Sequence, residues 1–421
     1  MGFALLYLSY RTFTMIQLKQ RLDALTSLRF FAAAMIVIHH SSGLFGSNSI
    51  HYFALGQAVS FFFVLSGFIL AYVYPKLENW SEIRRFWRAR IARVWPALMV
   101  SLFLAYWLES QSWDSMVILA NILMIHAWIP LPKYFFSYNA PSWSISTEFF
   151  FYLAFPILIY RWDKTWCIKL LAFGIIVVLL IAVSDLLSLP RYRSINDSLT
   201  STALLYIHPA SRIFEFIFGI FVAFYWRKKV GSIQWSESRA SLYEVGVILL
   251  AGASMHFNPL ATWIANTWPE SHAPQWCHQN GSIFAFGLLI YIIAIGRGRI
   301  TAWLSLPILV LLGEISFSVY LLHQILLFCY STHISSFPHL PNILSLSIFW
   351  VILLLASYLM WALIEMPSRR LILGQRQKKI HGTNAMRKSW HSHLNLNRNT
   401  ISATIILTCL LAYIGLFSIA K

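Results

Sequence analysis

The sequence has few charged residues for its length. Asp, Glu, Lys and Arg make up 11% of its 421 residues, and 58% are hydrophobic. Soluble domains carry about 25% charged residues. A mean hydropathy of +0.64 points the same way. These values exclude an ordinary soluble domain and predict an all-α, polytopic membrane protein, in which Trp and Tyr collect at the membrane–water interfaces.

Cysteine is also scarce. The four residues, Cys167, Cys277, Cys329 and Cys409, have no CxxC spacing, so they predict neither a disulfide framework nor a zinc site. The fourteen histidines are dispersed without the paired spacing of a metal site, and we expect no metal. No internal repeat is visible, which weakens the case for a secondary transporter, because such folds are commonly built from repeats.

Lys and Arg outnumber Asp and Glu, 32 to 15, giving a net charge of +17. The basic residues lie in short segments between apolar runs, which is the positive-inside pattern of membrane proteins rather than a nucleic-acid surface. The segment 83–96 contains five arginines and predicts a cytoplasmic loop. This places the N-terminus in the cytoplasm as well. Residues 1–10 lack the basic start and cleavage site of a signal peptide.

Hydropathy and charge predict about ten core spans and one C-terminal span. The core spans lie near 25–42, 53–74, 96–108, 142–160, 168–187, 209–226, 242–257, 282–295, 313–330 and 343–364, and the C-terminal span near 401–419 ends outside. The segment 116–128 is short, and a crossing there would place two later basic clusters outside, so we expect a re-entrant segment. Residues 301–312 are expected to follow the inner interface before a break at Gly313.

Arg29 and His40 are the most informative polar pair. They are eleven residues apart, so a helix places them on nearly the same face, about 16 Å apart along its axis. Ionisable groups at membrane depth usually face a bundle interior and serve a function. Alternatively, Arg29 snorkels to the headgroups and His40 is a satisfied polar residue. A histidine suits a general base for an alcohol, and an arginine suits an anionic donor.

Three other polar segments interrupt the spans. Ser144 and Glu148 are one helical turn apart, and they either border a site or cap and neutralise a helix start. Ser66-Gly67 predicts a close helix crossing. The strip from Gly313 leads to a further histidine, His323.

The ordered set of motifs resembles the acyltransferase-3 family of bacterial membrane O-acyltransferases over roughly residues 20–370. The motifs are Arg29-x10-His40, Phe61–Phe68, Arg85–Pro96, Trp143–Glu148 with Phe151-Tyr152-Leu153, Arg212–Gly219, Gly313–His323 and Ile364-Glu365-Met366-Pro367. The resemblance implies a ten-span enzyme that moves an acyl group, often acetyl, from cytoplasmic acyl-CoA to a hydroxyl. The acceptor would be a surface polysaccharide, lipopolysaccharide or other glycosylated molecule.

The resemblance also implies roles for individual residues. The expected catalytic residues are His40 as the base, Arg29 as its partner on the CoA side, and Glu148. Arg85, Arg88 and Arg93 are expected to contact the phosphates of CoA, the only co-substrate we predict. Trp143, Ser144 and His323 are expected to bind the acceptor. Two positions depart from the family pattern, since Phe30 stands in place of a usual Gly and Met366 in place of a common Arg.

These expectations divide the chain into an N-terminal extension (1–19), an acyltransferase domain (20–370), a basic cytoplasmic linker (371–399) and a C-terminal transmembrane helix (400–421). The expected location is the bacterial inner membrane, with the C-terminus extracytoplasmic. The expected partners are the bilayer, acyl-CoA and a surface glycan or glycolipid, with no nucleic acid. Two alternatives remain open at this point: a transporter or flippase of a lipid-linked sugar, and a polymerase or ligase of surface glycan.

Overall fold

The computed structural model describes residues 23–45, 53–109, 114–191, 198–333 and 340–374, and these form helices and connecting turns without a β-strand. Ten helical segments in this part of the chain are long and apolar enough to cross a membrane. They are Asp23–Ser41, Leu55–Val73, Trp80–Leu108, Ala140–Ile159, Trp162–Leu186, Ala203–Ser232, Glu237–Thr267, Ala273–Ile295, Pro307–His333 and Asn342–Leu373. The predicted all-α polytopic membrane fold with about ten core spans is confirmed.

The helices that position the site are Asp23–Ser41, here called the first helix, and five that follow. These are α2 (Ala58–Val73), α3 (Trp80–Glu109), α6 (Trp143–Ile159), α8 (Pro209–Lys229) and α14 (Pro307–His333). The other spans are built from α7 (Trp162–Leu186), α9 (Glu237–His256) with α10 (Pro259–Thr267), α11 (Ala273–Asn280) with α12 (Ile283–Ile295), and α15 (Asn342–Met360). A π-helix, Trp361–Glu365, joins α15 to α16 (Met366–Leu373).

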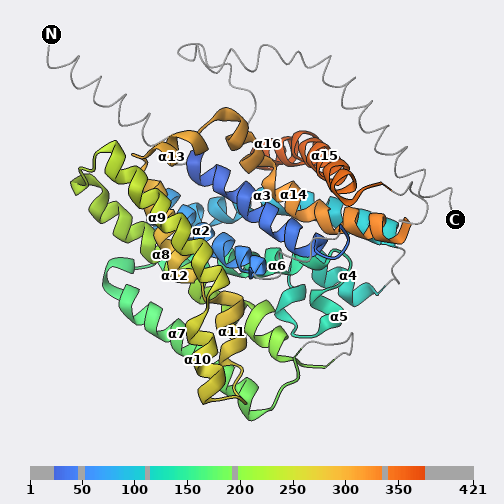
Figure 1. Cartoon of the computed structure of the whole chain (residues 1–421), viewed down its shortest axis with the longest axis horizontal. Coiled ribbons are helices and arrows are strands. Elements are labelled where there is room, and N and C mark those ends of the chain that lie inside the picture. Colours follow the sequence, from blue (N-terminus) through green and yellow to red (C-terminus); the bar gives the residue numbers. More distant parts are fainter. Residues whose placement is uncertain (1–22, 46–52, 110–113, 192–197, 334–339, 375–421) are drawn as a thin grey trace, which may run out of the picture.

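Helices α2 and α8 lie side by side and pack closely against each other (Figure 1). A Cβ atom on Gly67 would lie 2.0 Å from the carbonyl oxygen of Phe216, and one on Gly219 would lie 2.0 Å from that of Val64. Each glycine therefore admits the backbone of the other helix, as small residues do where membrane helices pack closely. The close crossing predicted at Ser66-Gly67 is confirmed. By contrast, α7 at the edge of the bundle exposes most of its apolar side chains, as a lipid-facing helix does.

The arginine-rich segment is not the loop that its charge predicted. It forms the first half of α3, a continuous 30-residue helix that carries Pro96 in its interior. The third span therefore begins earlier than residue 96. Positive charge marks where a chain approaches the cytoplasmic interface, but it does not mark where a helix begins. As a result, some of these arginines face the bundle interior and others face outward.

The segment 116–128 does not cross the bundle as one helix, in agreement with the prediction. Helix α4 (Ser115–Ile122) ends two residues before Met124, whose φ of 56° lies in the left-handed region. Asp114 caps α4 by accepting hydrogen bonds from two backbone N–H groups. A hydrogen bond from Lys133 contributes most to lowering the pKa of the Asp114 carboxyl. The cap therefore stays ionised near neutral pH.

The predicted break at Gly313 is wrong. Helix α13 (Arg299–Leu304) is short, and α14 begins at Pro307 and runs through Gly313 without interruption. A Cβ atom on Gly313 would lie 2.1 Å from the carbonyl oxygen of Thr26, so this glycine brings α14 against the first helix. The predicted C-terminal span, most of the basic linker and the whole N-terminal extension lie outside the described residues.

Candidate active site

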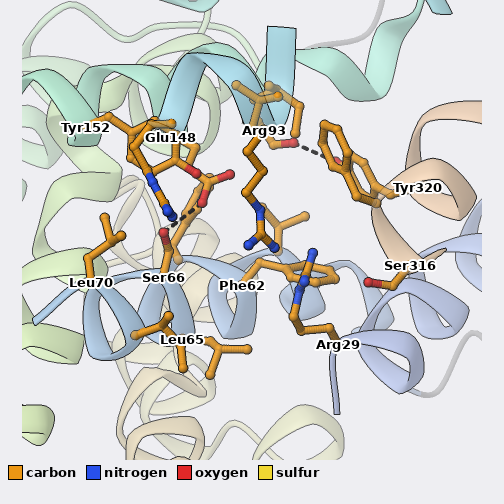
Figure 2. Close-up of a pocket in the computed structure, with 18 of the residues that line it drawn as sticks. Arg29, Phe62, Leu65, Ser66, Leu70, Arg93, Glu148, Tyr152, Ser316 and Tyr320 are labelled. Atoms are coloured by element: carbon orange, nitrogen blue, oxygen red, sulfur yellow. Dashed lines mark hydrogen bonds between the residues drawn. The ribbon is translucent and has the colours of Figure 1, made fainter. Parts of the chain in front are cut away.

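A cavity that is partly open to its surroundings lies between the first helix, α2, α3, α6 and α14. The polar residues that line it are Thr26, Arg29, Ser66, Arg90, Arg93, Ser144, Glu148, Tyr152, Ser316 and Tyr320. Figure 2 shows Arg29 and Arg93 reaching into the same space from opposite sides. Two of the predicted site arginines, far apart in the sequence, thus face one cavity.

Positive charge dominates this cavity. Three guanidinium groups line it, those of Arg29, Arg90 and Arg93, against the single carboxylate of Glu148. Among the described residues, none of the three arginines has a carboxylate within ion-pair distance. The Nε atom of Arg90 is buried and has no hydrogen-bond partner there. Unpaired guanidinium groups in a cavity create a binding site for an anion, because Arg binds phosphate and carboxylate in a bidentate manner.

The two acidic groups near the arginines are held by serines. Ser66 donates a 2.7 Å hydrogen bond to Oε1 of Glu148, which turns this carboxylate toward α2 (Figure 2). Ser318 donates a hydrogen bond to Oε1 of Glu365, at the end of the π-helix. Glu365 also interacts electrostatically with Arg29. Both carboxylates therefore lie close enough to orient the arginines without neutralising them in direct ion pairs.

Ser144 and Tyr320 lie together in the cavity wall. The hydroxyl groups of Ser144 and Tyr320 are 2.8 Å apart, and Tyr320 also donates a 3.0 Å hydrogen bond to the carbonyl oxygen of Pro141. The Tyr320 ring is in contact with the ring of His323, which lies one turn further along α14. Nε2 of His323 is 2.8 Å from Nδ1 of His40. The cavity and the two histidines are thus connected through Tyr320.

His40 itself does not line the cavity. It lies at the end of the first helix opposite to Arg29, and its side chain is exposed, whereas His323 is fully buried. Arg29 faces residues of α14 across the cavity, and His40 contacts His323 on the same helix. Helix α14 thus contributes Ser316 to the cavity that Arg29 lines and His323 to the contact with His40.

Three of the predicted site residues lie elsewhere. Arg85 and Arg88 are exposed and do not line the cavity. Trp143 packs against Phe63 and Tyr206, with its ring 5.9 Å from the guanidinium carbon of Arg212. It is part of a buried network outside the cavity and does not border it.

That buried network surrounds Arg212 on α8. Its side chain is fully buried, forms an ion pair with Glu215 at 3.2 Å, and donates hydrogen bonds to Ser60 and to Asn280. A buried charge requires such partners. The network joins α8 to α2 and α11, and we interpret it as structural.

The structure adds site residues that the sequence reading did not select. Arg90, Tyr152 and Tyr320 line the cavity, and Glu365 lies near it. The sequence does point to Arg90, because it lies three residues before Arg93 and residues three apart share a helix face. Since Glu365 comes from a distant part of the sequence, no local pattern could place it beside Arg29. Within the described residues, no group of three or more His, Cys, Asp or Glu could hold a metal ion.

Residues 22–365 match the acyltransferase-3 family, described as an acyltransferase domain. The chain belongs to this family. It is also similar to Acyltransferase MdmB of Streptomyces mycarofaciens, with 30% identity over 331 residues, which cover 72% of this chain and 78% of the relative. No solved structure matches it. This acyltransferase-3 protein is thus a membrane acyltransferase, and the assignment favours acyl transfer over the transporter, polymerase and ligase alternatives.

Proposed function

We propose that this acyltransferase moves an acyl group, expected to be acetyl, from cytoplasmic acyl-CoA to a hydroxyl of a surface polysaccharide, lipopolysaccharide or other glycosylated acceptor. The observation that carries the proposal is the cavity itself. Its arginines lack ion-pair partners among the described residues, and Tyr320 connects it to a histidine pair. The reaction needs a site that binds the anionic donor and a base that takes the proton of the acceptor hydroxyl. The arginines fit the first requirement and the histidine pair fits the second.

The donor end of the cavity carries Arg29, Arg90 and Arg93. CoA carries several phosphate groups, and guanidinium groups bind phosphate through charge-assisted, bidentate hydrogen bonds. Arg90 and Arg93 lie in the part of α3 that the positive-inside pattern assigns to the cytoplasmic side. Acyl-CoA is made in the cytoplasm, so a donor site there needs no export of CoA.

The acceptor end carries His40. In the proposed reaction, the acceptor oxygen attacks the thioester carbonyl carbon while its proton passes to a ring nitrogen of His40. The new C–O bond forms, the C–S bond breaks, and the proton is returned to the departing sulfur as the thiol of CoA. Because the His40 side chain is exposed, an acceptor can approach it without passing through the arginine cavity.

The experiment that tests this proposal compares His40→Ala with His39→Ala. Both histidines are exposed at the end of the first helix, but only His40 contacts His323 through a 2.8 Å hydrogen bond. Loss of a general base lowers rates by about 10²- to 10⁴-fold. We therefore expect His40→Ala to abolish acylation of the surface glycan in the native host, as measured by mass spectrometry, at unchanged protein abundance.

The neighbouring substitution serves as the control. His39→Ala should retain most of the acylation, since the His39 ring lies beside Gly56 and the hydrogen bond to His323 comes from His40. Normal acylation in the His40→Ala strain would contradict the proposed base, and equal loss in both strains would assign the role to the pair rather than to His40. A deletion strain analysed in the same way gives the mass of the transferred acyl group and so tests whether it is acetyl.

A further inference from the structure

The two histidines are joined in a defined geometry. Nδ1 of His40 lies 2.8 Å from Nε2 of His323, and the two rings are nearly parallel, with an interplanar angle of 4°. Nδ1 of His323 lies 2.6 Å from the backbone carbonyl oxygen of Tyr320. Three groups thus form one chain of hydrogen bonds, from a backbone carbonyl through a buried ring to the exposed ring of His40.

The chemistry of the carbonyl fixes where the protons lie. A carbonyl oxygen accepts hydrogen bonds and cannot donate, so Nδ1 of His323 must carry a hydrogen atom. In a neutral imidazole the other nitrogen is then an acceptor, which makes Nε2 of His323 an acceptor. Nδ1 of His40 must therefore donate. The neutral His40 ring then has its lone pair on Nε2.

The surroundings of His323 favour the neutral ring. Its side chain is 0% exposed, and among the described residues no carboxylate lies within ion-pair distance of it. The aromatic rings in contact with it are those of Tyr320 and His40. A buried charge without a partner is costly, so a doubly protonated His323 is disfavoured. With a neutral His323, only one arrangement of protons satisfies both hydrogen bonds.

We propose that His323 is a positioning residue that holds His40 in the Nδ1–H tautomer and so presents Nε2 as the base. This inference rests on the proposed function, because it assumes that His40 takes the proton of the acceptor hydroxyl. A general base oriented by a further hydrogen-bonded group is a recurring arrangement in acyl transfer. Here a neutral imidazole and a backbone carbonyl supply the orientation.

The arrangement is also compatible with the reaction. When Nε2 of His40 accepts the proton, Nδ1 still donates to Nε2 of His323, and this hydrogen bond becomes charge-assisted and stronger. Formation of the C–O bond and cleavage of the C–S bond then return the proton from Nε2 to the sulfur of CoA. His323 keeps its own proton throughout, so the hydrogen bond to Tyr320 is not broken during the reaction.

The test compares His323→Gln with His323→Met. Gln places an acceptor oxygen near the position of Nε2, whereas Met has a similar length and only a weak acceptor. Removal of the partner that orients a metal-ligating histidine costs about 10- to 100-fold in affinity or activity, and we expect a similar effect on the catalytic histidine here. We expect His323→Met to lower kcat by about that factor with little change in KM for acetyl-CoA, and His323→Gln to restore most of the loss.

His333→Met, later on the same helix, is the control and should keep the wild-type kcat. Equal kcat for His323→Gln and His323→Met would overturn the proposal, provided that thermal unfolding curves show both variants to be folded. So would a loss that appears only in KM for the donor, since orientation of the base affects the chemical step rather than donor binding.

Nitrogen-15 NMR of protein labelled in its histidine rings provides a second readout that needs no activity. The His40 signals are assigned by their loss in His40→Gln. We expect Nδ1 protonated and Nε2 unprotonated in the wild type, and a mixture of tautomers in His323→Met. A wild-type His40 protonated at Nε2 would overturn the proposal. Activity retained in His40→Ala would instead refute the proposed base, whatever tautomer NMR reports.

Discussion

Arg93 has no carboxylate within ion-pair distance among the described residues. It lines the cavity opposite Arg29, and the two like charges interact unfavourably across it. Residues that serve only stability are seldom arranged in this way, because repulsion between buried charges destabilises the folded state. An anionic ligand would remove the repulsion. Binding and stability should therefore respond differently when Arg93 is removed.

We expect Arg93→Ala to weaken binding of CoA without lowering the unfolding temperature of the ligand-free protein. Hydrogen bonds to charged groups contribute about 1.5–3 kcal/mol, which corresponds to roughly a 10- to 150-fold increase in Kd. Isothermal titration calorimetry with CoA measures the first effect, and a thermal unfolding curve in detergent measures the second. An unchanged Kd would remove Arg93 from the donor site.

Arg85→Ala is the matched control for that experiment. Arg85 belongs to the same helix and the same arginine-rich segment, but it is exposed and does not line the cavity. Screened surface charges contribute little, so the Kd for CoA should stay within about twofold of the wild type. Equal weakening in both variants would indicate general attraction by the positive surface rather than a specific contact in the cavity.

The sequence predicted some of the residues that line the cavity and missed others, and the reason is physical. Arg29 and Glu148 stand out because a charge within an apolar segment is expensive and so indicates a function. The family resemblance groups Arg85 and Arg88 with Arg93, yet a helix turns them to other faces. The helical periodicity of α3 separates Arg85 and Arg88 from Arg93.

The close packing of α2 against α8 depends on Gly67 and Gly219, which have no side chain to separate the two helices. Replacing Gly67 by Ala places a Cβ atom 2.0 Å from the carbonyl oxygen of Phe216, so the two helices must separate. Overpacking of this kind typically costs about 1–3 kcal/mol, and a clash with backbone lies at the upper end. We expect Gly67→Ala to lower the unfolding temperature in detergent and to reduce the yield of monodisperse protein.

Gly246→Ala provides the comparison. Gly246 also lies within a helix, α9, but a Cβ atom there would have no neighbour within 4 Å. Alanine has the higher helix propensity, so the unfolding temperature should be unchanged or slightly higher. If both variants lose stability equally, the loss comes from replacing glycine in general and not from the α2–α8 crossing.

Ser66 and Gly313 show which contacts become clear only when the packing of the helices is known. Ser66-Gly67 predicted a helix crossing correctly, but the hydrogen bond from Ser66 to Glu148 required knowing that α6 lies on the other side of the cavity. The low helix propensity of glycine predicts a helix break at Gly313. In the bundle it allows close contact with Thr26, and packing against the first helix compensates for its low propensity.

At the scale of the whole molecule, the site is assembled from distant segments. Arg29 near the start and Glu365 near the end of the described chain interact in the bundle, together with residues from α2, α3, α6 and α14. Hydropathy predicted the number of spans well, because each span must be apolar by itself. It could not predict which spans are neighbours, since any apolar helix is compatible with lipid.

The orientation of the bundle in the membrane is the last expectation, and it determines which substrate reaches which end. The arginine-rich half of α3 is expected in the cytoplasm, and the segment 258–279, which contains no Lys or Arg, is expected outside. We would replace all four native cysteines and introduce Arg85→Cys or Glu270→Cys, both at exposed positions. A membrane-impermeant maleimide should label Glu270→Cys in intact spheroplasts and Arg85→Cys only after permeabilisation.

Labelling of both variants after permeabilisation is the control for accessibility. Labelling of Arg85→Cys in intact spheroplasts would reverse the bundle and place the arginine cavity on the side away from cytoplasmic acyl-CoA. The proposed donor would then fail even if His40 remained essential, because the positive cavity would face the wrong compartment. The expected pattern instead places Arg93 toward the cytoplasm and His40 toward the outer face, so that the donor and the acceptor enter from opposite sides of the membrane.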